Sequence, residues 1–505
     1  MTFNDMLRRT AWRLPDHTFL HWSDKNRSMT YAQGDQISDQ VAGALAGLGI
    51  EKGDRVGIFA HNGLDYVMAM YGAWKLGAMS AHISVLQADN LAYFVNDSAP
   101  KVLIYTGDMH PAIERDRPQM PSVKHYICYD GAKDGSSDWS TLIAAAPKPP
   151  AVCVEDEDPA HLSYTSGTSG KPKGAVLAHG VVARATHCIA ERLGLSSADI
   201  SLGPTSLASS YHLVANLLPG IHRGVTIGLL SKWNAETAWD EMDRRGVTVF
   251  PSNPLLLTDI LNVSRQRGRK PKALRIGVSG GAPVPPDLKR AYQDELGVIL
   301  VESYGQSELG GFVALGYPRR EEGERLGAIG PALPDKEVWI ADEKGDEVPA
   351  GQPGEMVLRG GYMWGYWGMP EKTAETLKGG WLHTGDMGRM DSEGYIYMLG
   401  RWSERIVSSG KVIFPRAMEE ALYRHPAVRY VAVIGKPDAK VGEIPKAIVA
   451  LYDGKSATPD ELIAHCHAEL GAENSPAAIE IIPQMPMTPT GKIAKADLQR
   501  RERGL

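Results

Sequence analysis

A glycine-rich stretch from Tyr164 to Gly174, YTSGTSGKPKG, holds the residue types that bind a polyphosphate. It contains three glycines, two lysines, one proline and five hydroxyl residues. Gly and Pro disfavour helix and strand interiors, and HLSYTS alternates like a short strand, so we predict a loop leaving a sheet. Glycine lets backbone N–H groups approach anionic oxygens. The spacing is not that of a Walker A loop, because Pro172 and Lys173 follow Lys171.

Three further stretches place small or polar residues at strand or loop ends. Gly280-Gly281-Ala282-Pro283 follows the predicted strand ALRIGVS, and small residues there let a planar ligand lie against the backbone. YGQSE (304–308) ends in a carboxylate, which suits Mg²⁺ bridging phosphates because Mg²⁺ prefers oxygen ligands. WLHTGD (381–386) ends in an aspartate that can accept hydrogen bonds from both ribose hydroxyls. Each stretch alone is compatible with a tight turn or a surface charge.

Composition excludes several classes of protein. The chain has 505 residues with a formal charge of −6, whereas nucleic-acid binders usually carry a basic surplus. A phosphate site must therefore be locally positive. The four cysteines lack metal-type spacing, which indicates reduced thiols and a cytoplasmic location. The N-terminal residues do not resemble a signal peptide, and no run of about 18 apolar residues predicts a membrane span. A homo-oligomer is compatible with the sequence, which does not reveal the oligomeric state.

The order of predicted elements indicates an α/β fold. Strands and helices alternate over residues 55–105 and again over residues 247–308, the rhythm of parallel sheets covered by helices. Residues 106–160 are less regular and are interpreted as a surface connection. Residues 326–399 have the Gly-rich turns of antiparallel β-structure. The last hundred residues are predicted to form a small α+β unit.

In these stretches the chain resembles the acyl-adenylate-forming (AMP-binding) superfamily. That superfamily holds acyl- and aryl-CoA ligases, the adenylation domains of peptide synthetases and firefly-type luciferases. The resemblance covers nearly the whole chain. It implies a large N-terminal domain (1–399) of two α/β layers plus a small β-barrel, and a small mobile α+β C-terminal domain (400–505). The joint between them would lie near residues 400–404.

The resemblance also implies a role for each nucleotide-binding residue. Tyr304 would stack on adenine, Ser307 would bind the α-phosphate, Asp386 would bind ribose, and Arg401 would reach ribose or phosphate. Glu308 would help hold Mg²⁺. The implied ATP- and AMP-binding residues are Thr165, Ser166, Gly167, Thr168, Ser169, Gly170, Lys171, Lys173, Gly281, Ala282, Pro283, Ser303, Tyr304, Gly305, Gln306, Ser307, Asp386, Arg401 and Lys492.

Near the C-terminus, PMTPTGKI (486–493) resembles the superfamily's last motif and aligns Lys492 with its catalytic lysine. Lys492, Thr165 and Glu308 are the implied catalytic residues. A second C-terminal segment, Ser408, Ser409, Gly410 and Lys411, resembles the one that lines the CoA tunnel. The acid-binding pocket is expected to involve Tyr211, His212, Ala208, Val214, Gly280 and Gly310. The chain departs from the pattern at Ser403, where the hinge is commonly Asp or Lys, and at Lys495, where arginine is usual.

These residues suit the activation of a carboxylic acid by ATP. A carboxylate is a poor acyl electrophile, and joining it to AMP supplies a good leaving group. The attack brings two anions together, so catalysis needs positioning and fixed positive charge rather than a protein nucleophile. We therefore expect an AMP-forming acid–CoA ligase that uses ATP, Mg²⁺ and coenzyme A on an aromatic or medium-chain acid. The alternatives are a free-standing enzyme that loads a carrier protein, and a non-catalytic nucleotide- or acyl-binding relative.

Overall fold

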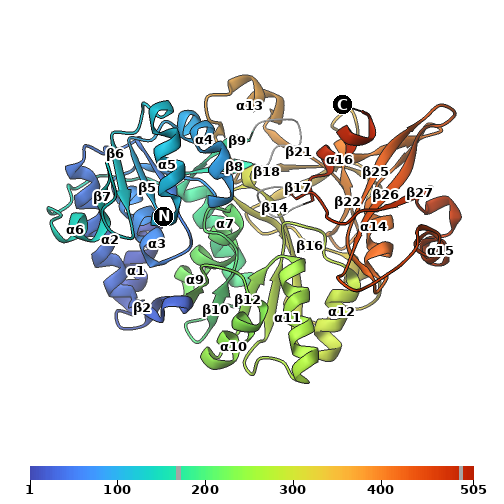
Figure 1. Cartoon of the computed structure of the whole chain (residues 1–505), viewed down its shortest axis with the longest axis horizontal. Helices are drawn as coiled ribbons and strands as arrows, with labels where there is room; N and C mark the ends of the chain where they lie inside the picture. Colours follow the sequence, from blue (N-terminus) through green and yellow to red (C-terminus); the bar gives the residue numbers. More distant parts are fainter. Residues whose placement is uncertain (166–171, 488–492, 505) are drawn as a thin grey trace.

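Two eight-stranded sheets make up most of the protein, and the helices between them share one hydrophobic core (Figure 1). The computed structural model describes residues 1–165, 172–487 and 493–504. The first sheet is parallel at its centre, where strands such as β5 are buried along their whole length because helices cover both faces. In spatial order its strands are β19 (Gly365–Tyr366), β9 (Lys173–Ala178), β8 (Pro159–Thr165), β4 (Met79–His82), β3 (Arg55–Phe59), β5 (Val102–Tyr105), β6 (His125–Cys128) and β7 (Ser137–Asp138).

The second sheet joins the middle of the chain to its N-terminus. Strand β1 pairs in parallel with β11, more than 200 residues later, and β2 pairs antiparallel with β1. In spatial order the strands are β15 (Gly311–Leu315), β14 (Ile299–Gln306), β13 (Ile276–Ser279), β12 (Val249–Ser252), β10 (Ile200–Gly203), β11 (Thr226–Leu229), β1 (Thr18–Trp22) and β2 (Arg27–Thr30).

Helices begin at capping residues and pack between the sheets. Thr2, Thr30 and Thr458 each form a capping box with the third residue of the helix that follows. The helices that cover the two sheets are α1 (Phe3–Arg13), α2 (Tyr31–Gly47), α3 (Leu64–Lys75), α4 (Leu91–Ser98), α5 (His110–Asp116), α6 (Trp139–Ala144), α7 (His179–Arg192), α8 (Ser210–His212), α9 (Leu218–Arg223), α10 (Ala235–Arg245), α11 (Pro254–Arg267) and α12 (Pro286–Glu295).

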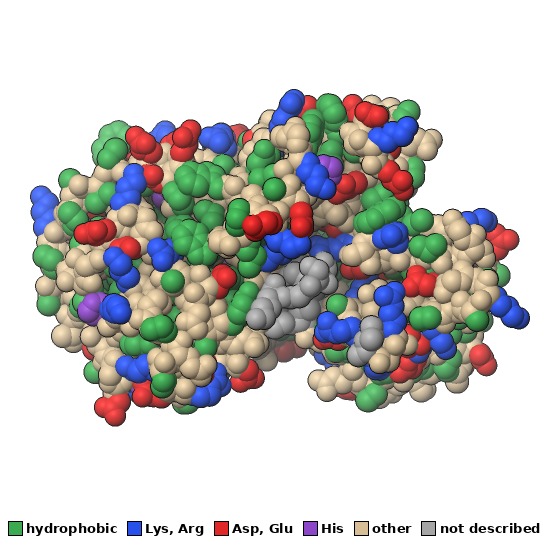
Figure 2. Space-filling view, turned by 90° about the horizontal axis from the view of Figure 1, so that it is seen from above, with side chains coloured by type: hydrophobic (Ala, Val, Ile, Leu, Met, Phe, Trp, Pro, Cys, Tyr) green, Lys and Arg blue, Asp and Glu red, His purple; other side chains and the backbone are tan. Residues whose placement is uncertain are grey.

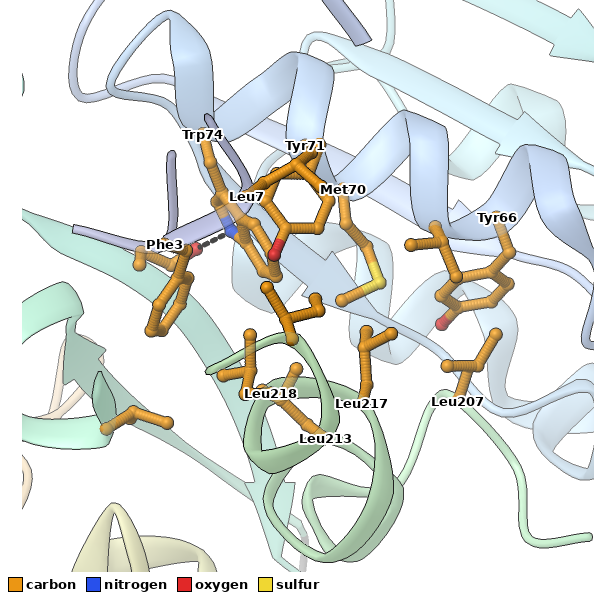
Figure 3. Packing of buried hydrophobic residues seen from close by; sticks show 14 of the residues in the cluster. Phe3, Leu7, Tyr66, Met70, Tyr71, Trp74, Leu207, Leu213, Leu217 and Leu218 are labelled. Atoms are coloured by element: carbon orange, nitrogen blue, oxygen red, sulfur yellow. Dashed lines mark hydrogen bonds between the residues drawn. The ribbon is translucent and has the colours of Figure 1, made fainter. Parts of the chain in front are cut away.

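Helix α3 lies at the centre of the core and is buried on all sides. Figure 3 shows Tyr71 and Trp74 of this helix in the same hydrophobic cluster as Phe3 of α1 and Leu213, Leu217 and Leu218. The indole Nε1 of Trp74 donates a hydrogen bond to the Ala160 carbonyl over 2.8 Å. The only polar atom of this large side chain is therefore satisfied, as burial requires. This packing fixes β8, the strand that precedes the glycine-rich stretch in sequence.

The remaining two sheets follow the α/β body. The third is an open antiparallel sheet with β16 and β17 at its edges, so the expected small barrel is a half-barrel. Its members are β16 (Gly330–Pro331), β22 (Tyr395–Arg401), β21 (Trp381–Met390), β18 (Gly354–Arg359), β17 (Glu337–Ala341) and β20 (Leu377–Lys378), and α13 (Pro370–Thr376) lies beside it. The C-terminal sheet comprises β24 (Lys411–Ile413), β23 (Ile406–Ser408), β26 (Gly442–Leu451), β25 (Val428–Asp438) and β27 (Ala478–Ile481), with α14 (Arg416–Tyr423), α15 (Pro459–Leu470) and α16 (Lys495–Glu502).

The expected α/β class and the separate C-terminal unit are confirmed. One expectation is wrong: residues 106–160 are not merely a surface connection, because β6 pairs in parallel with β5 and its last three residues are buried. The strand HYIC begins with a polar residue and lies in an irregular stretch, so its pattern is weaker than that of VLIY in β5, which is equally short. Within the part of the chain that the structure describes, every helix is too short or too polar to cross a bilayer.

Candidate active site

The polar residues expected at the nucleotide come from strand ends of three sheets. Thr165 ends β8, Tyr304 and Gln306 lie at the end of β14, and the 3₁₀ turn η6 (Ser307–Leu309) follows and packs against β8 and β9. Figure 2 shows the surface hollowed between the large N-terminal body and the smaller C-terminal lobe, with Lys and Arg side chains gathered in the hollow. The locally positive region that a phosphate site needs is therefore present, although the chain as a whole is acidic.

Asp386 is the centre of a polar network that comes from three strands. Tyr304 Oη donates a hydrogen bond to Asp386 Oδ2 over 2.7 Å, and Gln306 Nε2 donates to the same oxygen over 2.6 Å. Arg401 occupies the paired position on β22, with its Nε 3.1 Å from Asp386 Oδ1. Among the described residues, Oδ1 accepts no hydrogen bond although it is buried. This oxygen can therefore accept a hydrogen bond from a ligand hydroxyl, as the predicted ribose contact requires.

Burial fixes the protonation states in this network. Burial and the neighbouring Asp386 carboxylate raise the pKa of Tyr304 well above its usual range, so the phenol stays protonated and donates. Burial alone would lower the pKa of Arg401, but Asp386 and Glu404 raise it above its ordinary value. Arg401 is therefore a permanent positive charge beside Asp386 Oδ1, the oxygen that accepts no hydrogen bond among the described residues.

Glu308 lies on η6, and residues far along the chain hold it. Tyr366 Oη donates a hydrogen bond to Glu308 Oε1 over 2.7 Å, and the Met363 amide donates to the Glu308 carbonyl over 2.7 Å. Among the described residues, the Glu308 side chain is hydrogen-bonded only through Oε1, and Oε2 has no hydrogen bond or ion pair. One carboxylate oxygen is thus fixed and the other is available, which fits Mg²⁺ held by one carboxylate and by phosphate oxygens.

Sequence reasoning missed Tyr366. Its ring also lies beneath Lys173, whose Nζ is 4.5 Å from the ring centroid. The signal in the sequence was weak, because GGYMWGY reads as a turn and gives no indication that its last tyrosine meets η6. Ser210 was also missed, because nothing in the sequence indicates that its hydroxyl lies 3.3 Å from that of Ser307.

Part of the predicted site lies outside the described residues. Thr165 is described, and its buried Oγ1 has no hydrogen-bond partner among the described residues, which fits the predicted contact with a phosphate oxygen. The predicted residues without a described position are Ser166, Gly167, Thr168, Ser169, Gly170, Lys171 and Lys492.

The residues expected to bind the acid differ in their burial and in the groups that they contact. Tyr211 Oη bonds to the carbonyls of Ser252 and Val278, each over 2.9 Å, so its ring is rigid. A Cβ on Gly280 would lie 2.7 Å from Tyr211 Cε2 and would clash with Ser303 Oγ, so these three residues meet. His212 is fully buried, and Nδ1 is 2.7 Å from the Thr205 carbonyl while Nε2 is 3.1 Å from Asn216 Nδ2. Burial lowers the pKa of His212 to about 4, so its ring is neutral.

The other small residues near the site allow close packing or backbone conformations that larger residues would not. Gly310, with φ +63°, packs where a Cβ would lie 2.6 Å from Val181, and a Cβ on Gly305 would lie 2.5 Å from the Gly311 carbonyl. Gly281 has φ +78°, a backbone conformation that residues with a side chain rarely adopt. It opens the turn Gly281-Ala282-Pro283 that leads to α12. Val214 is buried in the core, and Ala208 is partly exposed.

In the C-terminal unit, the residues expected to bind CoA form a tight hairpin. Ser408 pairs with Lys411, and Ser409 and Gly410 at the turn have φ +50° and +76°. Lys495, the departure from the usual arginine, lies 2.8 Å from Glu404 and 2.9 Å from Glu419. It therefore ties the start of α16 to the 3₁₀ turn η8 (Trp402–Glu404), which follows β22.

Comparison with known proteins agrees with this geometry. The sequence matches the AMP-binding enzyme family over residues 7–367 and the AMP-binding enzyme C-terminal domain over residues 417–492. The chain belongs to the AMP-binding enzyme family. It is 32% identical over 476 residues to a feruloyl-CoA synthase of Amycolatopsis sp, covering 94% of each chain. It is 31% identical over 479 residues to the long-chain-fatty-acid–CoA ligase FadD13 of Mycobacterium tuberculosis, covering 94% of this chain and 93% of FadD13.

A solved structure is similar to the whole chain. The anthranilate CoA ligase AuaEII in complex with anthranoyl-AMP is 28% identical, with a TM-score of 0.93, covering 100% of this chain and 97% of that one. The sequence-based expectation is confirmed at the level of the enzyme class: the protein is an AMP-forming acid–CoA ligase.

Proposed function

We propose that this AMP-binding enzyme activates an aromatic or medium-chain carboxylic acid with ATP and transfers the acyl group to CoA through the residues described above. The observation that carries this proposal is the network at Asp386, where Tyr304 and Gln306 occupy one carboxylate oxygen and leave the other beside Arg401. An aromatic acid is supported by the similarity to the feruloyl-CoA synthase and to the anthranilate ligase. It is also supported by the rigid ring of Tyr211, which can face a planar substrate.

In the first step, the acid's carboxylate oxygen attacks the α-phosphorus of ATP. The bond from that phosphorus to the bridging oxygen breaks, and pyrophosphate leaves. Two anions meet, so the positive charges of Arg401 and Lys492 stabilise the transition state, and the hydroxyls of Thr165 and Ser307 donate to phosphate oxygens. In the second step, the CoA thiol loses its proton to solvent and its sulfur attacks the acyl carbon; the carbon–oxygen bond to the phosphate breaks, and AMP leaves.

Mg²⁺ would be held by Glu308 Oε2 together with phosphate oxygens. When bound, it neutralises negative charge on the triphosphate. The protein's own contribution at this point is to keep one carboxylate oxygen of Glu308 free, because Tyr366 occupies the other.

We further propose that the N-terminal domain (1–399) and the C-terminal domain (400–505) move about residues 400–404. Strand β22 ends at Arg401 and the short turn η8 follows, so little regular structure crosses this point. We also propose that the cysteines of this enzyme are reduced and that it is located in the cytoplasm.

The acid class is tested by acid-dependent exchange of labelled pyrophosphate into ATP, with benzoic, cinnamic, medium-chain and short-chain acids. We expect the highest kcat/KM with an aromatic or medium-chain acid, and a large decrease in the variant Glu308→Gln. Exchange supported only by acetate or propionate would overturn the assignment of the acid. Normal exchange, with no acyl transfer to CoA but acyl transfer to a phosphopantetheinyl carrier protein and release of AMP, would indicate the carrier-loading alternative.

A further inference from the structure

The Glu308 carboxylate is held by a residue 58 positions along the chain, through the hydrogen bond from Tyr366 Oη to Glu308 Oε1. Tyr366 is only 7% exposed, so water competes little for this bond. A hydrogen bond to a charged carboxylate is among the stronger ones in proteins, and it orients as well as stabilises. Tyr366 therefore fixes the rotation of the Glu308 carboxylate, to which we have assigned the Mg²⁺ of the ATP complex.

Tyr366 is itself fixed from three directions. Its amide donates a hydrogen bond to Thr373 Oγ1 over 2.9 Å, and its backbone pairs with Ala175 of β9. The Lys173 ammonium lies over its ring, a favourable cation–π geometry. Tyr366 thus joins β9, the strand that follows the glycine-rich loop, to η6, which carries Glu308.

The backbone around Glu308 is held by the same part of the chain. The Met363 amide donates to the Glu308 carbonyl over 2.7 Å. Lys336 Nζ donates to the Leu309 carbonyl over 3.1 Å and also to the Gly361 carbonyl. The main chain of η6 and the side chain of Glu308 are therefore both set by residues 361–366.

From this geometry we infer that Tyr366 is a positioning residue, which presents the free oxygen of Glu308 to the divalent cation of the ATP complex. The inference rests on the proposed role of Glu308. It assigns Tyr366 no contact with the substrate, because its hydroxyl is already used on Oε1 and its ring face is covered by Lys173.

The test is the variant Tyr366→Phe, which keeps the ring beneath Lys173 and removes only the hydroxyl. With the full-length enzyme and ATP, Mn²⁺ binding is measured by electron paramagnetic resonance, and pyrophosphate exchange is measured across Mg²⁺ concentrations. We expect Mn²⁺ affinity to fall about tenfold, the size expected for loss of one charge-assisted hydrogen bond, and half-maximal exchange to need about tenfold more Mg²⁺. At saturating Mg²⁺ the rate should stay within about twofold of the parent enzyme.

The matched control is Tyr362→Phe, on the same segment, whose hydroxyl donates to the Gly380 carbonyl at an exposed position. It should leave both measurements unchanged. The double variant Tyr366→Phe with Glu308→Gln should bind Mn²⁺ as weakly as Glu308→Gln alone, because Tyr366 acts through Glu308.

Three results would overturn the inference, and they are distinguishable. Parent-like Mn²⁺ binding by Tyr366→Phe, with weak binding by Glu308→Gln, would reject the role of Tyr366 and leave the proposed function intact. Additive losses in the double variant would show that Tyr366 acts through general packing. Parent-like binding by Glu308→Gln would reject the proposed role of Glu308 itself.

Discussion

Asp386 and Arg401 face each other at paired positions of neighbouring antiparallel strands, with Arg401 Nε 3.1 Å from Asp386 Oδ1. The same carboxylate accepts hydrogen bonds from Tyr304 and Gln306 on its other oxygen. A buried carboxylate with three fixed neighbours and one oxygen without a hydrogen bond is organised for a ligand rather than for stability alone.

Replacement of Asp386 by Asn should weaken ATP use. The amide cannot accept from Tyr304 and Gln306 and also balance Arg401, so the nucleotide side of the site loses order. We expect kcat/KM for ATP to fall by roughly tenfold to a hundredfold, about 1.5–3 kcal/mol for hydrogen bonds to a charged group. The measurement is pyrophosphate exchange at varied ATP. Asp89→Asn, at a carboxylate with 98% exposure, is the control and should not change the rate.

Replacement of Gly280 by Ala should change acid selection. The new methyl group would press on Tyr211, which two carbonyls hold in place, and on Ser303, whose hydroxyl bonds to the Ser279 carbonyl over 2.9 Å. We expect kcat/KM for aromatic acids to fall more than about tenfold, and that for short aliphatic acids to fall less. Gly327→Ala is the control, because no atom lies within 4 Å of its added Cβ. Equal losses for all acids would reject a role of this wall in selecting the acid.

A charged group of the C-terminal domain reaches a buried glutamate of the N-terminal body. Arg416 of α14 lies 3.6 Å from Glu302 of β14, and Lys289 lies 2.7 Å from the same carboxylate. Removing one partner of a buried ion pair is destabilising. Arg416→Met should therefore loosen the C-terminal domain and speed chymotryptic cleavage near Trp402 several-fold. Arg500→Met, which removes an exposed pair with Asp497, should not. Parent-like cleavage of Arg416→Met would show that the ion pair does not restrain the domain.

Two neighbouring buried histidines predict loss of stability in mild acid. The rings of His82 and His161 are 4.4 Å apart, and both ring nitrogens of His161 lack a partner among the described residues. Burial lowers the pKa of His82 to about 4 and that of His161 well below its usual value. Below pH ~6.5 the unfolded chain therefore binds more protons, so stability is complete above that pH and falls as the pH drops toward about 4, by at most ~1.4 kcal/mol per histidine per pH unit.

His161→Leu should reduce this dependence, because the buried leucine has no charged form. The measurement is the difference in Tm between pH 7 and pH 5, which should be smaller in His161→Leu than in the parent. His187→Gln, at an exposed histidine, serves as the control. An unchanged difference in His161→Leu would mean that other groups cause the acid sensitivity.

The sequence predicted the fold class and the motifs that form the site, but not which side chains of these motifs contact one another. The alternation over residues 55–105 and the motif YGQSE depend on local patterns, which are visible in one stretch of chain. The contact between Tyr366 and Glu308 depends on the pairing of β19 with β9, and the contact of Arg401 with Asp386 depends on strand register. Register is set by tertiary packing, so neither contact could be derived from spacing. Strand β6 was missed because HYIC is a weaker apolar run than VLIY of β5, a strand of the same length that was predicted.

The central claim is tested most directly by following all products with ATP, Mg²⁺ and an acid that supports pyrophosphate exchange, with and without CoA. We predict pyrophosphate release that depends on the acid, and one AMP and one acyl-CoA formed for each ATP consumed when CoA is present. Formation of ADP in place of AMP, or pyrophosphate release that is indifferent to the acid, would contradict the assignment of an AMP-forming acid–CoA ligase.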